Sequence, residues 1–123
     1  MSEARLTLGA WGEARAVEYL RRQGMKILEQ NFTTRVGEID IIARDKKNLV
    51  FVEVKTRRSI VFGSPQEAVG LRKQRQIIRT AHWYLQNHPC GKYQPRFDVI
   101  AVLCQSGEDV QITHIADAFS LSD

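Results

Sequence analysis

Acidic side chains interrupt two apolar runs in the segment GEIDIIARDKKNLVFVEVKT, which spans residues 37–56. β-Branched and aromatic residues dominate both runs, and the polar turn DKKN separates them, so the sequence predicts a hairpin of strands 37–44 and 49–56. Strands of this kind favour apolar side chains at the positions that Asp40 and Glu53 occupy. These two acids are therefore the first candidates for chemistry.

The register of this hairpin decides whether the acids meet. If the two lysines of the DKKN turn form its tip, directly opposed residues have numbers that sum to about 93, by the geometry of a two-residue turn. Asp40 then faces Glu53, and Glu38 faces Lys55. A slip of one residue would send the two acids to opposite faces of the sheet. Strict alternation predicts one face for Glu38, Asp40 and Ile42 and the other face for Ile39, Ile41 and Ala43.

Two opposed carboxylates repel each other, so their burial beneath helices requires compensation. Either a raised pKa keeps one carboxyl group neutral, or a divalent cation binds between them. Mg²⁺ binds through one or two carboxylates and completes its shell with water and phosphate oxygens. Lys55, on the same face as Glu53, would stabilise the charge that develops on a scissile phosphate. The pattern predicts metal-dependent phosphodiester hydrolysis; its alternatives are a solvated strand face for the acids and an ion pair of Lys55 with Glu38.

Two further candidates lie on predicted helices. Glu13 falls inside the apolar stripe of a helix over residues 8–23, so docking of this stripe would carry the carboxylate toward the same spot as a metal or water ligand. Gln74 lies within the apolar face of a later helix and would reach the site as a hydrogen-bonding neighbour. The alternatives are a Glu13 that reaches solvent at the edge of the stripe and a Gln74 at the flank of its helix.

The formal charge of +4 and a pI of about 9.3 favour an anionic partner. We expect this partner to be nucleic acid, DNA rather than RNA, with a solvated basic face as the alternative. The candidate phosphate-binding residues are Arg57, Arg58, Arg72, Lys73, Arg75 and Arg79.

Composition excludes several other classes. With 43% apolar and 26% charged residues the chain has the composition of an ordinary globular protein, and it contains no apolar run that could span a membrane. Its first residues lack the pattern of a signal peptide, so we expect a cytoplasmic protein. Cys90 and Cys104 are too few and too far apart for a zinc cluster. Asp98 is either a polar residue at a strand edge or a support for the site, and no ligand-like spacing relates His82, His88 and His114.

The remaining pattern indicates one domain, residues 1–123, with an α/β fold. A capping box at residues 64–67, S-P-Q-E, begins a long helix that Gly70 interrupts. We predict a mixed sheet flanked by helices in the order α-β-β-α-β-β. In this order, the predicted elements are a helix at 8–23, the hairpin, a helix at 64–87, and strands at 96–104 and 110–115. Residues 27–32 are predicted as a further short strand before the hairpin.

GEID followed by FVEVKTR resembles the PD-(D/E)xK nuclease superfamily. Together with GAWGEARAVEYLRRQG before it, and GSPQEAV, KQRQIIRTAHWYL and RFDVIAV after it, nearly the whole chain is similar to the uncharacterised bacterial YraN-like family, which is related to Holliday junction resolvases. Ile39 stands where the superfamily motif has proline, and resolvase-like members often lack that proline.

This resemblance implies a restriction-endonuclease-like fold with a defined set of site residues. Asp40 and Glu53 correspond to metal ligands, Lys55 to the catalytic lysine, Glu13 to the helix-borne acid of the resolvase branch, and Gln74 to a glutamine that follows the E-x-K strand. A homodimer is implied by analogy, because resolvases of this branch cut symmetrically related strands as dimers.

The expected function is that of a Mg²⁺- or Mn²⁺-dependent endonuclease acting on structured DNA, with branched DNA as one candidate, in which an activated water attacks the phosphorus. Two alternatives stay open at this point. One is a nucleic-acid-binding module whose acids are vestigial, and the other is an interaction domain that docks on a DNA-processing protein through its basic helix.

Overall fold

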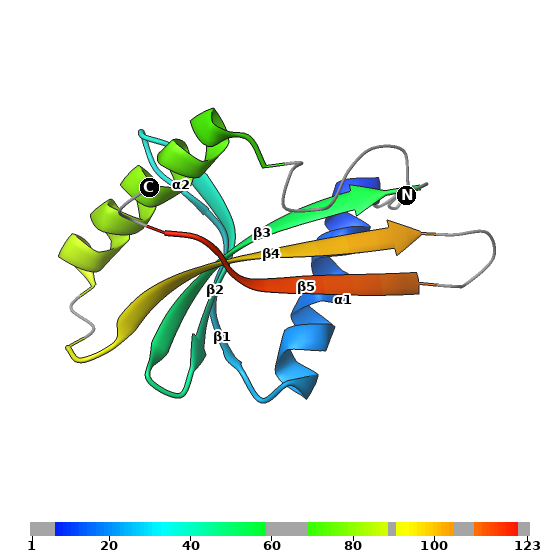
Figure 1. Ribbon diagram of the computed structural model, residues 1–123, viewed down its shortest axis with the longest axis horizontal. Helices are drawn as coiled ribbons and strands as arrows, with labels where there is room; N and C mark the ends of the chain where they lie inside the picture. Colours follow the sequence, from blue (N-terminus) through cyan, green and yellow to red (C-terminus); the bar gives the residue numbers. More distant parts are fainter. Residues whose placement is uncertain (1–6, 59–68, 89–90, 105–109, 121–123) are drawn as a thin grey trace, which may run out of the picture.

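The computed structural model describes residues 7–58, 69–88, 91–104 and 110–120. A five-stranded sheet separates two helices, α1 (Leu8–Arg22) and α2 (Leu71–Asn87), which pack on opposite faces (Figure 1). This arrangement confirms the predicted mixed sheet flanked by helices and is consistent with a restriction-endonuclease-like fold. Neither helix is long and apolar enough to cross a membrane.

The strands follow one another across the sheet in the order of the chain. Neighbouring strands are antiparallel, except that β3 (Asn48–Arg57) and β4 (Gln94–Cys104) are parallel. Helix α2 lies between these two strands in the sequence and returns the chain to the same end of the sheet. The strand expected at residues 27–32 is an edge strand of eight residues, which precedes the predicted hairpin. The five strands are β1 (Lys26–Thr33), β2 (Glu38–Asp45), β3 (Asn48–Arg57), β4 (Gln94–Cys104) and β5 (Val110–Phe119).

Local signals at the helix ends agree with the sequence. The Thr7 hydroxyl accepts a hydrogen bond from the Ala10 amide at 3.0 Å and caps α1, and Gly24, with φ of 90°, follows the end of that helix. Gly70 has extended backbone angles and is the N-cap of α2. The expected interruption at Gly70 is thus the point where the described helix begins, whereas the capping box at residues 64–67 lies outside the described residues.

Each face of the sheet has its own apolar core. On the α1 side, Ala16, Val17 and Leu20 pack against alternate strand residues such as Val50 and Val52. On the α2 side, the buried residues are Ile39, Ile42, Leu49, Phe51, Val69, Ile77, Ala81, Tyr84, Phe97, Val99 and Phe119. Strands buried on both faces explain the nearly continuous apolar runs of β3 and β4.

The packing of α1 on β3 depends on a glycine. Gly12 is buried, and a Cβ atom built on it would overlap the Thr56 side chain, lying only 2.8 Å from both Cβ and Cγ2 of that residue. Because such a distance is well below van der Waals contact, the helix can approach β3 this closely only without a side chain at position 12. This approach sets the height of α1 above the sheet.

We expect Gly12→Ala to lower the free energy of unfolding by about 1–3 kcal/mol, the usual effect of overpacking a close contact. The matched control is Gly9→Ala on the same helix, because nothing lies within 4 Å of a Cβ there. Alanine forms helices better than glycine by roughly 1 kcal/mol, so this control should be neutral or stabilising. Urea denaturation measures both variants, and equal midpoints would contradict the close approach.

Candidate active site

The hairpin has the predicted register along most of its length. Paired residues run from Asp45 and Asn48 to Ile41 and Val52, and their numbers sum to 93 as expected for a tip of two lysines. The regular pairing of β2 with β3 ends there. Beyond Ile41, β2 continues to pair with β1 on its other side.

Asp40 lies where β2 and β3 part. Its Oδ2 atom accepts a hydrogen bond from the Val54 amide at 2.8 Å. In a regular continuation of this hairpin, that amide would donate to the carbonyl oxygen of Ile39. The carboxylate therefore takes the place of a backbone acceptor. Because the Asp40 side chain lies between the two backbones, β3 is farther from β2 here than in a regular ladder.

The predicted strict alternation of side chains between the two faces of β2 is wrong at this point. Ile39 packs in the same core as Ile42, on the α2 side, whereas Ile41 and Ala43 pack on the α1 side. The reason is that β2 leaves the regular ladder with β3 at Asp40, so the period of two is interrupted between Ile39 and Ile41. The interruption leaves Asp40 accessible to groups from both faces of the sheet.

Glu53 is the partner of Asp40 on the α2 side. Its carboxyl group interacts with that of Asp40, and the residue is only 6% exposed. Burial and the negative charge of Asp40 raise the pKa of Glu53 from 4.5 to about 7, against the opposing effect of two lysines. Burial likewise raises the pKa of Asp40, although the hydrogen bond from the Val54 amide and the interaction with Glu53 favour its charged form. Near neutral pH, the two carboxyl groups can therefore share a proton.

Two lysines lie beside Glu53. The Nζ atom of Lys55, from the same strand, is 3.7 Å from Oε2 of Glu53, and the Nζ atom of Lys73, from the first turn of α2, is 4.0 Å from the same oxygen. The side chain of Lys73 is also 3.4 Å from Oε1 of Gln76. Sequence analysis placed Lys73 in the basic face alone, but α2 brings its ammonium group to the acids.

Glu13 reaches Asp40 from the α1 side, as its place in the apolar stripe predicts. Its carboxyl group interacts with the side chains of Asn31 and Asp40. Burial and the charge of Asp40, with a smaller effect of Glu38, raise the pKa of Glu13 from 4.5 to about 7. The three acids thus form a row, Glu13, Asp40 and Glu53, that passes from one face of the sheet to the other.

Asn31 is the residue that the sequence analysis missed. It lies on β1 with φ of 52°, between the paired residues Gln30 and Phe32, at the position opposite Asp40. Asparagine tolerates this left-handed conformation better than most residues. An asparagine within an otherwise regular strand was the only local signal, since asparagine is depleted in strands.

Gln74 and Glu38 take positions at the margin of this row. The Gln74 amide donates to the Val69 carbonyl oxygen at 2.8 Å, where it secures the start of α2, and among the described residues it makes no hydrogen bond to the three acids. Glu38 is exposed and contributes negative charge to Glu13 and Asp40. The predicted pairing of Glu38 with Lys55 is not part of the β2–β3 ladder, which ends at Ile41 and Val52.

A hard divalent cation would compensate for the negative charge of the row of acids, which the folded chain alone compensates only in part. Three neighbouring carboxyl groups repel one another, and hydrogen bonds and two lysines compensate only in part, as the raised pKa values indicate. Within the described ranges, however, no three Asp, Glu, His or Cys side chains form a ready set of metal ligands. Asp40 and Glu53 are thus a two-carboxylate site, which is the number that Mg²⁺ commonly uses.

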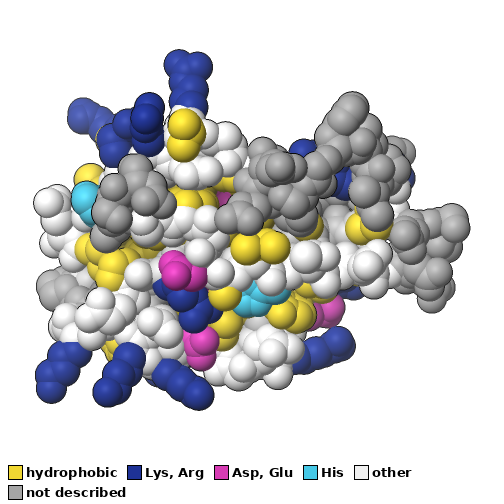
Figure 2. All heavy atoms as spheres, in the orientation of Figure 1, with side chains coloured by type: hydrophobic (Ala, Val, Ile, Leu, Met, Phe, Trp, Pro, Cys, Tyr) yellow, Lys and Arg dark blue, Asp and Glu magenta, His cyan; other side chains and the backbone are white. Residues whose placement is uncertain are grey.

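The predicted basic residues divide into two groups. Lys73 points to Glu53, whereas the others are exposed to solvent. Figure 2 shows Lys and Arg side chains projecting from the surface above α2. The exposed members of the set are Arg57, Arg58, Arg72, Arg75 and Arg79.

Metal-free protein is expected to lose stability as the pH rises from about 5 to about 7.5. Because Glu13 and Glu53 have a pKa near 7 in the folded chain and near 4.5 without burial, the folded state holds protons in this window that the unfolded state has released. The contribution is complete below pH ~4.5 and is lost as the pH passes ~7. Thermal unfolding in EDTA across this range measures the effect.

The control for this prediction is Glu53→Gln, which cannot titrate at position 53 and which frees its neighbours of one negative charge. Its melting temperature should fall less between these pH values than that of the unmodified protein. Added Mg²⁺ should stabilise the unmodified protein more at the higher pH, because a cation binds the deprotonated carboxylates. Parallel pH profiles of variant and parent would contradict the assignment of a raised pKa to Glu53.

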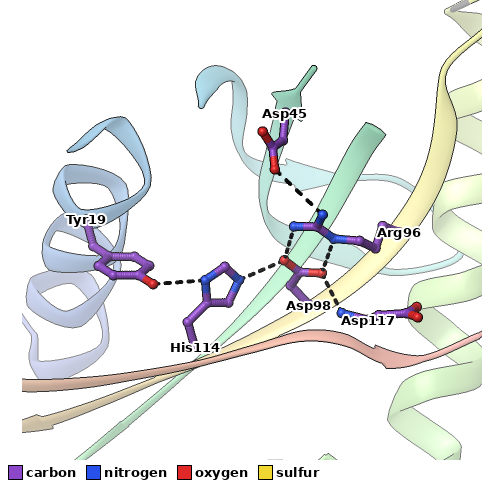
Figure 3. A network of polar contacts seen from close by, with 6 residues as sticks. All are labelled: Tyr19, Asp45, Arg96, Asp98, His114 and Asp117. Carbon is purple, nitrogen blue, oxygen red and sulfur yellow. Dashed lines mark hydrogen bonds and ion pairs between the residues drawn. The ribbon is translucent and has the colours of Figure 1, made fainter. Parts of the chain in front are cut away.

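A second polar cluster surrounds Asp98, whose role the sequence left open. The carboxylate is fully buried and accepts two hydrogen bonds from Arg96, at 2.9 and 2.8 Å, and a contact of 2.7 Å from Nε2 of His114 (Figure 3). The Asp117 amide donates to it at 3.0 Å. Burial alone would raise the pKa of Asp98, but these hydrogen bonds outweigh it and hold the pKa below its ordinary value.

This cluster joins elements that are distant in the sequence. The hydroxyl group of Tyr19 on α1 lies 3.0 Å from Nδ1 of His114 on β5, and Arg96 on β4 also lies 3.6 Å from Asp45 on β2 (Figure 3). None of these residues contacts the row of acids. The cluster links α1, which carries Glu13, to β4 and β5.

Comparison with known proteins agrees with the motifs. Residues 12–102 match the model of the uncharacterised protein family UPF0102. A UPF0102 protein of Syntrophotalea carbinolica is 57% identical over 98% of both chains, and one of Syntrophomonas wolfei is 49% identical over 91% of this chain and 96% of its own. A UPF0102 protein of Rhodococcus jostii is 46% identical over 93% of this chain and 97% of its own. The chain therefore belongs to the uncharacterised protein family UPF0102, the YraN-like family that its motifs resemble.

Proposed function

We propose that this protein is a Mg²⁺- or Mn²⁺-dependent endonuclease that hydrolyses phosphodiester bonds in DNA. One observation carries the proposal. The carboxyl groups of Asp40 and Glu53 interact where β2 and β3 part, with the ammonium groups of Lys55 and Lys73 at 3.7 and 4.0 Å from Glu53. Carboxylates and lysines in this arrangement can hold a cation and a phosphate side by side.

The cation would be held by Asp40 and Glu53, and Glu13, on the other side of Asp40, would bind a water molecule of its shell. Oxygen donors of this kind suit Mg²⁺ and Mn²⁺. Once bound, such an ion supplies a Lewis acid for the phosphate and lowers the pKa of a water molecule.

The other groups of the site have separate roles. Lys55 would hold its positive charge at the phosphate, where negative charge develops during hydrolysis. Glu13, with a pKa of about 7 and an interaction with Asn31, is suited to accept or return a proton at neutral pH. Lys73 joins the acids to α2, so a phosphate bound at the site would also contact the start of that helix.

Helix α2 supplies the argument for a nucleic acid as substrate. The helix carries four cations, Arg72, Lys73, Arg75 and Arg79, and no acidic residue. Cations near a helix N-terminus oppose the helix dipole, which costs roughly 0.3–1 kcal/mol for each residue. Placement of two of them in the first turn is thus unfavourable for folding alone, and phosphate binding would compensate for it. The resemblance to resolvases favours branched DNA within this class.

The test is a cleavage assay on end-labelled duplex, single strand, flap and four-way junction. Each substrate is incubated with the protein in EDTA and then with Mg²⁺ or Mn²⁺. We expect metal-dependent products from at least one branched substrate and none in EDTA. RNA of the same sequences serves as the control for the class of nucleic acid.

A different result would favour the binding-module alternative. If a substrate binds with strong salt dependence but yields no product with either metal, the proposed reaction is wrong and the acids have another use. If the protein neither binds nor cleaves any of these substrates, the argument that α2 binds nucleic acid is wrong as well.

A further inference from the structure

Trp83 continues the row of arginines on α2. At 100° per residue, Arg72, Arg75, Arg79 and Trp83 fall within an arc of roughly 80° on one face of the helix. All three arginines are exposed, and Trp83 is 41% exposed, one of only four large apolar residues that remain so open among the described residues. An aromatic ring thus stands in line with three guanidinium groups.

The ring of Trp83 is backed by other aromatic residues. Phe32 on β1 lies 5.9 Å from it between centroids, tilted by 45°, and Phe32 in turn meets Tyr84 edge to face at 5.1 Å. Tyr84 is almost fully buried and stacks on His88 at 4.1 Å. A tryptophan supported in this way loses little freedom when a further ring stacks on its open side.

The row of arginines runs along α2 from the end of the helix that carries Lys73 to Trp83. Lys73, at the start of α2, is 4.0 Å from Glu53, and Trp83 lies ten residues further along, which is about 15 Å on an α-helix. Residues 71–87 contain no acid that would repel a phosphate on this path. The spacing of three and four residues also repeats the positive charge about every 5–6 Å along the helix.

We propose that the outer face of α2 binds an unpaired segment of a nucleic-acid strand, with one base stacked on Trp83 and the adjoining phosphates on Arg79 and Arg75. Stacking on an aromatic side chain needs the face of a base, which a base pair within a duplex does not offer. The inference rests on the proposed function and narrows its substrate to nucleic acid with unpaired nucleotides near the cleaved bond.

Fluorescence of Trp83 provides a direct test. Trp11→Phe leaves Trp83 as the one tryptophan of the chain, and all titrations are done in EDTA so that cleavage does not occur. The probes are oligothymidylate, a duplex with blunt ends, and a strand of the same length without bases. We expect oligothymidylate to quench the fluorescence strongly, and the duplex and the baseless strand to quench it little while still binding.

Substitution at position 83 gives the second readout. In the parent chain, Trp83→Leu should weaken binding of oligothymidylate about 10-fold, the usual effect of losing one stacked base, and leave duplex binding unchanged. Trp83→Phe retains a ring and should recover most of the affinity. Thermal unfolding establishes that each variant is folded, and Phe also preserves the contact with Phe32.

The outcomes separate this inference from the proposed reaction. Quenching that depends on bases supports the inference whether or not any substrate is cut. Equal quenching by the baseless strand, or none by oligothymidylate, overturns it even if branched DNA is cleaved. Full affinity of Trp83→Leu for single strands overturns it as well and would leave the exposed ring for a protein partner.

Discussion

Asparagine at position 40 is expected to abolish metal-dependent cleavage, with a loss of at least ~100-fold in rate, while DNA binding persists. The Asp40 side chain has two functions that this substitution separates. An amide oxygen can still accept the hydrogen bond that the Val54 amide donates at 2.8 Å, so the parting of β2 and β3 is preserved. The negative charge that a cation requires is lost.

Stability should move in the opposite direction from activity. Asp40 contributes charge that raises the pKa of both Glu13 and Glu53. Without that charge, repulsion in the row of acids decreases, so metal-free Asp40→Asn should melt at the same temperature as the parent or higher. Stabilisation by added Mg²⁺ should disappear. A gain in stability with a loss of function is the usual sign of a site that is strained for its task.

Asp45→Asn is the matched control, since Asp45 lies at the other end of β2 and contacts Arg96 at 3.6 Å, away from the acids. This variant should cleave at the rate of the parent. Lys55→Ala completes the set, because it should lose cleavage and keep both the fold and most of the binding. Cleavage by Asp40→Asn at a rate near that of Asp45→Asn would contradict the role of Asp40.

The second large effect concerns stability alone. We expect Asp98→Asn to lower the free energy of unfolding by about 3–5 kcal/mol, the usual result of breaking a buried ion pair from one side. Asp98 is fully buried and accepts from Arg96, His114 and the Asp117 amide. The amide NH₂ of asparagine would face hydrogen-bond donors that now contact Asp98. The guanidinium of Arg96 would also lose its charged partner.

Urea denaturation measures this loss, and Asp45→Asn again serves as the control. Asp45 is partly exposed and holds Arg96 only through a contact of 3.6 Å, so its neutralisation should change stability by ~0–1 kcal/mol. Because the cluster reaches Tyr19 on α1, the Asp98 variant should also loosen the helix that carries Glu13. A midpoint for Asp98→Asn within the range of the control would contradict the prediction that the Asp98 cluster stabilises the fold.

Much of the fold could be predicted because its signals are local. The two-residue turn of lysines determines the register from Asp45 to Ile41, and alternation along β3 places Glu53 and Lys55 on one face. The apolar stripe of α1 similarly indicates the direction of Glu13. Turn chemistry and the periods of strands and helices depend on neighbours in the chain, so a sequence reports them directly.

Contacts between segments that are distant in the sequence could not be predicted from such local signals. Lys73 could be recognised as a basic residue, but only the docking of α2 decides that its ammonium group lies 4.0 Å from Glu53. Asn31 supports Glu13 because β1 adopts a left-handed conformation opposite Asp40, and Gln74 serves the start of its own helix instead of the acids. A shift of a few degrees in a docked helix would move Lys73 or Glu13 away from the other acids without altering any periodic pattern.

The sequence by itself determined the two strands, their register and the set of acids and lysine that could perform hydrolysis. Only the tertiary structure decided that β2 and β3 part at Asp40, that Glu13 and Glu53 approach this residue from opposite faces, and that burial brings their pKa values to about 7. The physical reason is that desolvation and charge coupling depend on what covers a group in space, which is the sum of all packing contacts around it.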